Sequence, residues 1–360
     1  MRQQSPAMEP DNNPQYIQVS KTSVTWLKTH LPGLSLVFSL SFIAYHLGGW
    51  FPAVGGPVFA ILLGIGVKTI LGDMDLLRDG IAFSAKQLLK CSVILIGAGL
   101  SLAEIWRTGK TALLLILVVV ALGMLIVQLV GRWMKLDSVL TGLIGVGTAI
   151  CGGTAIAAIA PIVRAREDQV VYAISTIFVF NVCAVVTYPV IGRLLGMEDI
   201  PFGYWAGLAI QDTSSVVAAG FSYSDAAGDT AAVVKLTRTL FLIPLSLIMA
   251  LAMGLAWRIN MKSEAQSGQM TNILKTFPWF VLGFIGLSAL CTWELISEAM
   301  SAGMVFAGKY LIIMAMASIG MSTNLKDIRA TGFKPMMLGC IAAVIIGIVS
   351  WLLVRLTVYG

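Results

Sequence analysis

The sequence consists largely of apolar runs about 20 residues long, separated by short segments that hold most of its charges. A helix of about 20 apolar residues is long enough to cross the hydrocarbon core of a bilayer. Over the 360 residues, 58% are hydrophobic and only 12% are charged, with a mean hydropathy of +0.88. Soluble domains contain about 25% charged residues. The sequence therefore predicts an all-α polytopic membrane protein and practically excludes a soluble fold.

Polar and Gly/Pro-rich breaks divide the chain into eleven candidate transmembrane segments. They cover approximately 31–50, 53–71, 87–106, 111–131, 138–162, 169–195, 204–222, 230–257, 276–296, 303–323 and 335–357. Residues 1–30 contain Pro, Asn and Gln and lack the apolar core of a signal peptide, so we expect a mobile cytoplasmic tail there. Residues 31–358 are expected to form a single transmembrane domain.

Lys and Arg residues are distributed unequally between the alternate connecting segments. The side that holds the N-terminal tail has 15 of them, whereas the other side has 5; the second group includes Arg164 and Arg166, and the first includes Arg193. Because basic residues are retained on the cytoplasmic side, this bias predicts a cytoplasmic N-terminus. With eleven spans, the C-terminus is expected outside.

Four basic residues fall inside the predicted spans: Lys90, Lys235, Arg238 and Lys309. A charge at mid-bilayer costs at least about 2.5 kcal/mol, so it normally faces the protein interior or an aqueous cavity. Lys235 and Arg238 are three residues apart and therefore share one helical face. One interpretation is a basic wall for an anionic substrate. The other is a structural pair neutralised by a carboxylate from Asp212, Asp225 or Asp229.

Two stretches with similar sequences lie far apart in the chain. They are Gly99–Gly109 (GLSLAEIWRTG) and Gly320–Gly332 (GMSTNLKDIRATG). Each ends one predicted span and precedes another, and the two spans, the third and the tenth, have opposite predicted orientations. The similarity therefore predicts an inverted-topology repeat, which is typical of many secondary transporters.

Small and polar residues interrupt the fifth and seventh predicted spans. Glycines do so in segment 142–158, and each costs about 0.8–1.0 kcal/mol in a helix interior: Gly145, Gly147, Gly152 and Gly153. Polar side chains do so in segment 207–220: Gln211, Asp212, Thr213, Ser214 and Ser215. We expect a helix break in each span, and two facing breaks would form a binding site at the middle of the membrane.

The orientations of these two spans conflict with an inverted pair. Spans five and seven should point the same way through the membrane, whereas inverted repeats point opposite ways. Two explanations are open at this point. Either the count of spans is wrong by one in this region, or the two broken spans are not a repeat pair.

Other residue patterns narrow the function classes. The five cysteines have no metal-site spacing and are interpreted as packing residues: Cys91, Cys151, Cys183, Cys291 and Cys340. Asn181, inside a span, either joins helices by hydrogen bonds or lines a site. No Walker A motif and no constellation for intramembrane catalysis is present, so we predict neither ATP-driven transport nor an enzyme. No cofactor and no nucleic-acid partner is predicted.

The runs GTAICGGTAIAAIAPIV and GLAIQDTSSVVAAG, the second followed by KLTRT, resemble the YeiH-type family of bacterial inner-membrane proteins, which are described as sulfate exporters. The likeness covers about residues 31–358. That family is similar to the cation/proton antiporters and bile-acid-type sodium symporters, which have inverted repeats and two broken helices that cross at mid-membrane. Those symporters place the two crossings five helices apart, whereas two separate them here.

The resemblance assigns residues to each crossing. One crossing would contain Thr148, Cys151, Gly152, Gly153 and Thr154. The other would contain Gln211, Asp212, Thr213 and Ser214. The resemblance also implies a bacterial inner-membrane location.

From these features we expect a secondary active transporter, an exporter, of a small anion such as sulfate, a sulfonate or an organic acid. Backbone N–H groups near 153–154 and 213–215 would bind the anion, with Lys235 and Arg238 supplying positive charge. Asp212, with Asn181, would couple transport to H⁺ or Na⁺. The alternatives are a cation/proton antiporter that uses Asp212 and a passive channel. The sequence is compatible with a homodimer.

Overall fold

A computed structural model describes residues 14–358 apart from 52–53, 73–74, 243, 246–247, 249–277 and 324–331. The described residues form helices and connecting segments, with no strand among them. Six stretches are long and apolar enough to cross a membrane: Lys28–Trp50, Asp75–Gly99, Leu102–Trp133, Glu167–Leu194, Glu298–Ser322 and Phe333–Thr357. This confirms the prediction of an all-helical polytopic membrane protein.

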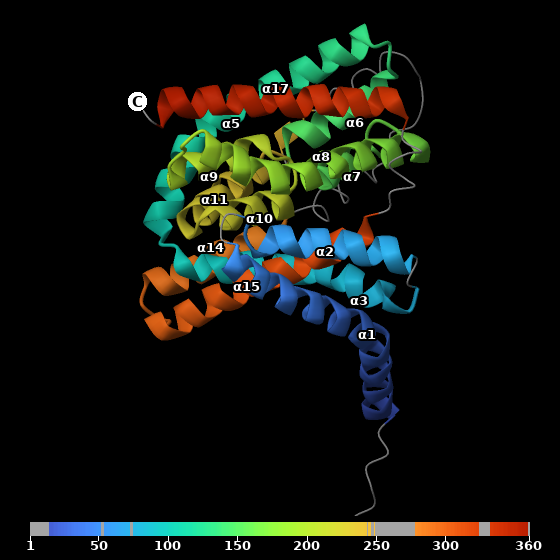
Figure 1. Ribbon diagram of the computed structural model, residues 1–360, viewed down its shortest axis with the longest axis vertical. Helices are drawn as coiled ribbons and strands as arrows, with labels where there is room; N and C mark the ends of the chain where they lie inside the picture. Colours follow the sequence, from blue (N-terminus) through green and yellow to red (C-terminus); the bar gives the residue numbers. More distant parts are fainter. Residues whose placement is uncertain are drawn as a thin grey trace, which may run out of the picture.

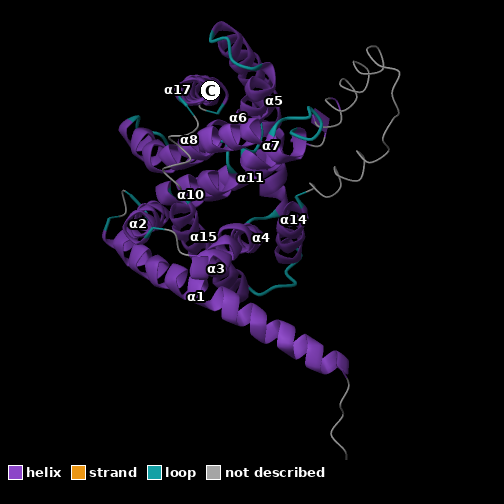
Figure 2. Cartoon of the chain, turned by 90° about the vertical axis from the view of Figure 1, so that its right-hand side faces the viewer, coloured by secondary structure: helices purple, strands orange, loops and turns teal. Residues whose placement is uncertain are grey.

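The helices form two bundles, which Figures 1 and 2 show one above the other. The first bundle contains α1 (Pro14–Trp50), α2 (Gly56–Leu71), η1 (Asp75–Leu77), α3 (Arg78–Phe83), η2 (Ser84–Leu88), α4 (Leu89–Ile96), η3 (Gly97–Gly99), α14 (Trp279–Thr292) and α15 (Glu298–Ser322). The second contains α5 (Leu102–Trp133), α6 (Ser138–Ala149), α7 (Gly153–Ile159), α8 (Glu167–Leu194), α9 (Asp199–Ala209), α10 (Thr213–Tyr223), α11 (Asp225–Leu240) and α17 (Phe333–Thr357).

Close helix packing holds the first bundle together. A Cβ atom added at Gly64 of α2 would lie 2.3 Å from the carbonyl oxygen of Ala317 in α15, and one at Gly320 would lie 2.3 Å from that of Ile61. Only glycine permits this approach, which is the small-residue packing common between membrane helices. The glycines therefore fix α2 against α15.

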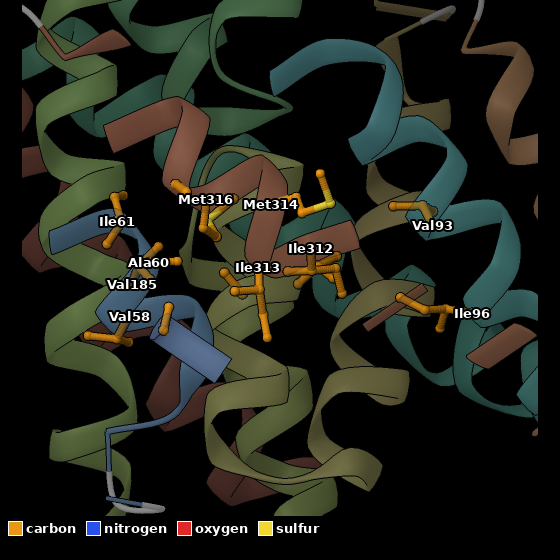
Figure 3. Packing of buried hydrophobic residues seen from close by; sticks show 14 of the residues in the cluster. Val58, Ala60, Ile61, Val93, Ile96, Val185, Ile312, Ile313, Met314 and Met316 are labelled. Carbon is orange, nitrogen blue, oxygen red and sulfur yellow. The ribbon is translucent and has the colours of Figure 1, made fainter. Parts of the chain in front are cut away.

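An apolar cluster joins the two bundles. Figure 3 shows its buried side chains, most of which come from α2, α4 and α15 of the first bundle. Val185 of α8 and Val217 of α10, both in the second bundle, belong to the same cluster. The contact between the two bundles is therefore largely apolar.

Two sequence predictions concern the ends of segments. The expected tail covers residues 1–30; residues 1–13 lie outside the described residues, and α1 begins at Pro14. The two similar stretches follow antiparallel helices, because Ser301 at the start of α15 donates a 2.7 Å hydrogen bond to Ala98 at the end of η3. The second stretch extends into residues 324–331, which are not described, and the inverted repeat itself stays a prediction.

Candidate functional site

The chain from α6 to α7 forms a re-entrant hairpin. Asp137 caps the start of α6 and accepts a 2.7 Å hydrogen bond from Gln169, in the first turn of α8, so the chain has returned to its starting level by α8. Gly147 of α6 lies against Ile156 of α7, as two antiparallel arms require. The tip is residues 150–152, where Gly152 has a φ of 65°. Glycine adopts this left-handed conformation without the steric cost that a side chain would impose.

The chain from α9 to α10 forms a second re-entrant hairpin. The aromatic rings of Phe202, in the first turns of α9, and Tyr223, at the end of α10, stack with centroids 3.8 Å apart. Tyr223 also donates a hydrogen bond to the carbonyl oxygen of Met197, just before α9. The two ends of the hairpin are therefore at one level, and its tip is residues 210–212.

The two hairpins enter the second bundle from opposite ends of α8. Gln169, at the start of α8, contacts the base of the α6–α7 hairpin. Arg193, in the last turn of α8, donates 3.1 Å hydrogen bonds to the carbonyl oxygens of Ser222 and Tyr223 at the base of the α9–α10 hairpin. Figure 1 shows α6 and α7 toward one end of the horizontal helices and α9 toward the other.

The tips meet beside Asn181, at the middle of the 28-residue helix α8. The side-chain oxygen of Asn181 accepts hydrogen bonds from the backbone N–H groups of Gln211, at 3.2 Å, and Asp212, at 3.0 Å. A Cβ atom at Gly152 would lie 3.6 Å from the Cβ of Asp212 and 3.7 Å from the side-chain nitrogen of Asn181. Asn181 thus both joins helices and lies between the two tips.

These hairpins correct part of the sequence prediction. Both helix breaks are present at the predicted residues, but segments 138–162 and 204–222 turn back at the break instead of crossing the membrane. The reason is length: α6 has 12 residues and α9 has 11, so each arm is about 16–18 Å long against a hydrocarbon core of about 30 Å. The orientation conflict disappears, because two hairpins that enter from opposite faces are inverted relative to each other.

The hairpins also move three basic residues relative to the prediction. Arg164 and Arg166 lie at the base of the α6–α7 hairpin, on the same side as the predicted cytoplasmic cluster at Arg132 and Lys135. Arg193 lies at the opposite end of α8. From the sequence, each of these three residues is expected on the opposite side. That expectation treats the hairpins as spans, and a span carries the chain across the membrane whereas a hairpin returns it to the same side.

Lys235, on α11, is fully buried and donates hydrogen bonds to three backbone carbonyl oxygens of the two tips. Its Nζ lies 2.8 Å from the oxygen of Ile150 and 3.2 Å from that of Ile210, and it also bonds the oxygen of Gln211. A lysine ammonium has three N–H donors. Three carbonyl acceptors therefore engage all of them.

Arg238, one turn further along α11, is also fully buried. Its Nε donates to the carbonyl oxygen of Ala149 at 2.9 Å, and one terminal nitrogen donates to that of Thr148 at 2.6 Å. The other terminal nitrogen donates to the oxygen of Leu208 at 2.6 Å. The guanidinium group thus binds the last turns of α6 and α9 at the same time.

The physical reason for this arrangement is the pair of helix C-termini that meet at the tips. The last carbonyl groups of a helix have no partner within the helix and carry a partial negative charge. Two such ends inside the membrane need cationic donors, which α11 supplies. No direct ion pair joins either cation to a carboxylate in the described part of the chain, so the direct partners of both cations are carbonyl oxygens. The predicted neutralisation by Asp212, Asp225 or Asp229 stays a prediction. The predicted basic wall stays a prediction.

Asp212 caps the start of α10. Its Oδ2 accepts hydrogen bonds from the backbone N–H groups of Ser214, at 2.9 Å, and Ser215, at 3.3 Å, and from the Ser214 hydroxyl. Such a cap satisfies the free N–H groups of a helix start. These three hydrogen bonds all engage Oδ2 and none engages the other carboxylate oxygen, Oδ1.

The predicted site residues divide into a buried set and an accessible set. Buried at the tips are Thr148, Cys151, Gly152, Asn181, Gln211, Ser214 and Ser215. Thr154 is exposed, and Gly153, Asp212 and Thr213 are half-buried. The accessible groups lie at the starts of the returning arms α7 and α10, whereas the ends of the entering arms are covered by the two cations. Of the five cysteines, none of which forms a disulfide, Cys151 alone is buried.

Sequence reasoning did not find a second polar region, at the boundary of the bundles. Lys309 of α15 pairs with Asp225 of α11 at 2.8 Å and lies 5.6 Å above the ring of Phe221. Two cavities of about 610 and 570 Å³ share Lys309. The signal was Lys309 inside a predicted span and Asp225 just after another, but the distance between the two residues along the chain hid the pairing. No group of three or more potential metal ligands occurs within the described ranges.

The match to known families covers both hairpins. Residues 32–339 match the family described as conserved hypothetical protein 698, which confirms the YeiH-type resemblance. A UPF0324 membrane protein of Streptococcus pyogenes serotype M18 is 39% identical over 336 residues, 90% of this chain and 97% of the relative. One from Clostridium tetani is 35% identical over 340 residues, 93% of this chain and 97% of the relative. One from Streptococcus agalactiae serotype V is 38% identical, covering 89% and 95%.

Proposed function

On the premise that the chain belongs to the conserved hypothetical protein 698 family, whose relatives are named membrane proteins, we propose that it is a secondary active transporter of a small anion. It works by alternating access in the bacterial inner membrane, and its N-terminus is cytoplasmic. Export of sulfate, a sulfonate or an organic acid is the direction and substrate class that the family resemblance favours.

The observation that carries the proposal is the meeting of two re-entrant hairpins at the middle of α8. Interrupted helices within the membrane are tolerated where their backbone groups line a binding site. Because the hairpins come from opposite faces, a shift of the second bundle against the first exposes the tips to one face or to the other. Such a shift would slide the two bundles along the apolar contact that joins them.

The charge at the tips favours an anion. Lys235 and Arg238 contribute two positive charges, and Asp212 contributes one negative charge, so the tips are net positive by one when all three are ionised. The partial charges of the two helix C-termini and the two N-termini that meet there offset each other. A bound anion neutralises this excess, whereas a bound cation would add to it.

The direct contacts with the anion come from the accessible side of the tips. Since the Lys235 donors are engaged by carbonyl oxygens, Lys235 and Arg238 act on the substrate through their charge and through the position of the hairpins. The hydroxyl groups of Thr154 and Thr213 are the exposed or half-buried donors next to the tips. The backbone N–H groups of Ser214 and Ser215 are not among these donors, contrary to the sequence prediction, because Asp212 accepts hydrogen bonds from both.

Asp212 is the group that couples transport to a cation. Its Oδ1 would take the proton or Na⁺, because the hydrogen bonds of the cap engage Oδ2, which holds the start of α10, while Asn181 holds the backbone. Binding of a proton or Na⁺ at Oδ1 therefore changes the charge at the tips while Asp212 continues to cap α10. Arg164 and Arg166 join the side of the N-terminus and Arg193 leaves it, so the net basic bias that supports a cytoplasmic N-terminus increases.

The test is flux of labelled sulfate and a panel of small organic anions into proteoliposomes under an imposed pH or Na⁺ gradient. Wild type is compared with Asp212→Asn and with Asp199→Asn, an exposed aspartate at the base of the same hairpin. We expect gradient-driven accumulation of an anion in wild type and Asp199→Asn, and its loss in Asp212→Asn.

Other outcomes assign the other functions. Exchange of Na⁺ or K⁺ for protons without anion flux, abolished in Asp212→Asn alone, would establish a cation/proton antiporter. Anion movement that equilibrates but never accumulates under any gradient would establish a passive channel. Either result overturns the proposal.

A further inference from the structure

A groove of about 490 Å³ lies between α8, α9 and α17, outside the hairpin tips. Its volume is within the range of roughly 300–1,000 Å³ that is typical of sites for small molecules. The walls are almost entirely apolar. Aromatic side chains lie at several levels, namely Phe180, Tyr188, Trp205 and Trp351, and aliphatic ones such as Leu195 and Ile348 lie between them. A polar substrate has few partners there.

The groove follows one half of the membrane. α17 runs parallel to α8, because Gly339 lies against Phe180 and Gly347 lies against Tyr188. The lining extends along α8 from Phe180, beside the tips, to Leu195, just past its end, a distance of about 22 Å at 1.5 Å per residue. One leaflet of the hydrocarbon core is about 15 Å deep.

Aromatic side chains form the floor of the groove. Trp205 of α9 donates a 2.8 Å hydrogen bond from its indole nitrogen to the carbonyl oxygen of Gly347, and its ring stacks on Tyr188 at 4.4 Å. The indole nitrogen is therefore already satisfied. The floor offers ring faces, which suit a hydrocarbon chain.

The two ends of the groove differ. At its outer end Arg355, exposed on α17, lies 5.3 Å above the ring of Trp351, which lines the groove. At its inner end the lining reaches Ala209 and Gln211, at the tip of the α9–α10 hairpin. The outer walls, including Ile191 and Ile348, are exposed, and α8 and α17 are both candidate membrane spans. The groove therefore opens sideways to lipid.

We propose that this groove binds one acyl chain of an anionic phospholipid whose phosphate contacts Arg355. The chain lies between α8 and α17 on the floor formed by Trp205, and its end reaches the hairpin tip at Gln211. Apolar walls match the chain, and an exposed cation at headgroup level matches the phosphate. The length of about 22 Å covers one leaflet of the hydrocarbon core together with its headgroup region. The site depends only on the placement of the protein in a membrane and not on its transport function.

The test measures lipid binding by native mass spectrometry of the purified full-length protein titrated with dioleoyl phosphatidylglycerol or dioleoyl phosphatidylethanolamine. Arg355→Gln removes the headgroup contact, and Ala343→Phe fills the groove from α17. Arg107→Gln and Ala121→Phe make the same changes at exposed positions of α5, away from the groove. In a background in which the other seven tryptophans are replaced by Phe, quenching of tryptophan fluorescence by phosphatidylglycerol brominated in its acyl chains reports whether the chain approaches Trp205 and Trp351.

We expect wild type to prefer phosphatidylglycerol, and Arg355→Gln to weaken that binding about five-fold. Ala343→Phe should reduce both lipid binding and the quenching, while the two control variants behave as wild type. Equal binding of both lipids, or quenching unchanged by Ala343→Phe, would overturn the proposal. A wild-type dimer that Ala343→Phe converts to a monomer, with lipid binding unchanged, would instead identify the groove as an interface between two copies of the chain.

Discussion

The two hairpins share one architecture. In each, a helix of 11 or 12 residues enters the second bundle, a three-residue tip reverses the chain, and a second helix returns to the same side. The carbonyl ends of both entering arms are bound by the same two cations of α11. A single pair of side chains therefore holds both hairpins at the same depth.

Their tips differ in chemistry. The α6–α7 tip is shaped by the backbone of Gly152, and no side chain caps the start of α7. The α9–α10 tip is shaped by Asp212, which caps α10 and brings a carboxylate to the site. The comparison teaches that the shape of a re-entrant tip can come from glycine or from a capping side chain. Only the second solution also places an ionisable group at the tips.

The largest effect is expected when the shared cation is removed. Arg238→Met leaves carbonyl groups of both entering arms buried without a donor, at a cost of about 1–3 kcal/mol for each group. We expect a loss of at least about 3 kcal/mol of stability, seen as a large fall in the Tm of the detergent-solubilised protein. Arg107→Met, at an exposed position, is the control. A Tm within a few degrees of wild type would show that the hairpins do not depend on this cap.

A smaller effect is expected at the glycine tip, where two adjacent residues provide a matched pair. Gly152 has a φ of 65°, so Gly152→Ala places a side chain in the left-handed region at a cost of about 1–2 kcal/mol. Gly153 begins α7 with no atom within 4 Å of an added Cβ, so Gly153→Ala should leave the Tm unchanged or raise it slightly. Equal Tm changes in the two variants would contradict the assigned role of Gly152.

The aspartate tip can be tested by separating its cap from its charge. Asp212→Asn keeps a side-chain oxygen for the N–H groups of α10, so its stability should change by only a few tenths of a kcal/mol while coupled flux is lost. Asp212→Ala should lose about 1 kcal/mol in addition. Asp137→Ala removes a comparable cap from the base of the other hairpin and should lower the Tm while coupled flux persists. Loss of coupling in Asp137→Ala would mean that any weakened cap disrupts transport.

Much of this site was readable in the sequence. Glycines near residue 150 and polar residues near 212 predict helix breaks, because both disfavour a continuous helix, and the breaks occur there. The shared face of Lys235 and Arg238 also follows from their spacing. The hydrogen-bond partners of Lys235 and Arg238 could not be predicted from the sequence, because they are backbone carbonyl groups, which every residue type possesses.

The hairpins themselves were not predicted, because hydropathy does not distinguish a span from two short arms of the same total length. The signal that could have identified them was the position of each break. A break near the middle of an apolar run leaves arms of 11 or 12 residues, too short to cross alone. The orientation conflict between the two broken segments was a second signal for hairpins, since the conflict disappears when both segments turn back.

The smallest effect on stability is expected at the contact that only one hairpin makes with the first bundle. Lys309 reaches the α9–α10 side through Asp225 and Phe221, and the described ion pairs include none from the first bundle to the α6–α7 hairpin. The Asp225 side chain is 74% exposed, so the pair contributes less than about 1 kcal/mol, and Asp225→Asn should hardly change the Tm.

Its effect on motion should be larger than its effect on stability, because the ion pair restrains one bundle against the other. In the Thr213→Cys background, Asp225→Asn should speed labelling by a membrane-impermeant maleimide added from the side of the α9–α10 base. Asp199→Asn, an exposed aspartate at the same base, should not. An unchanged labelling rate in Asp225→Asn would show that this pair does not restrain the hairpin. Faster labelling with an unchanged Tm would instead show that the Lys309–Asp225 ion pair restrains the motion of the bundles without contributing to the stability of the fold.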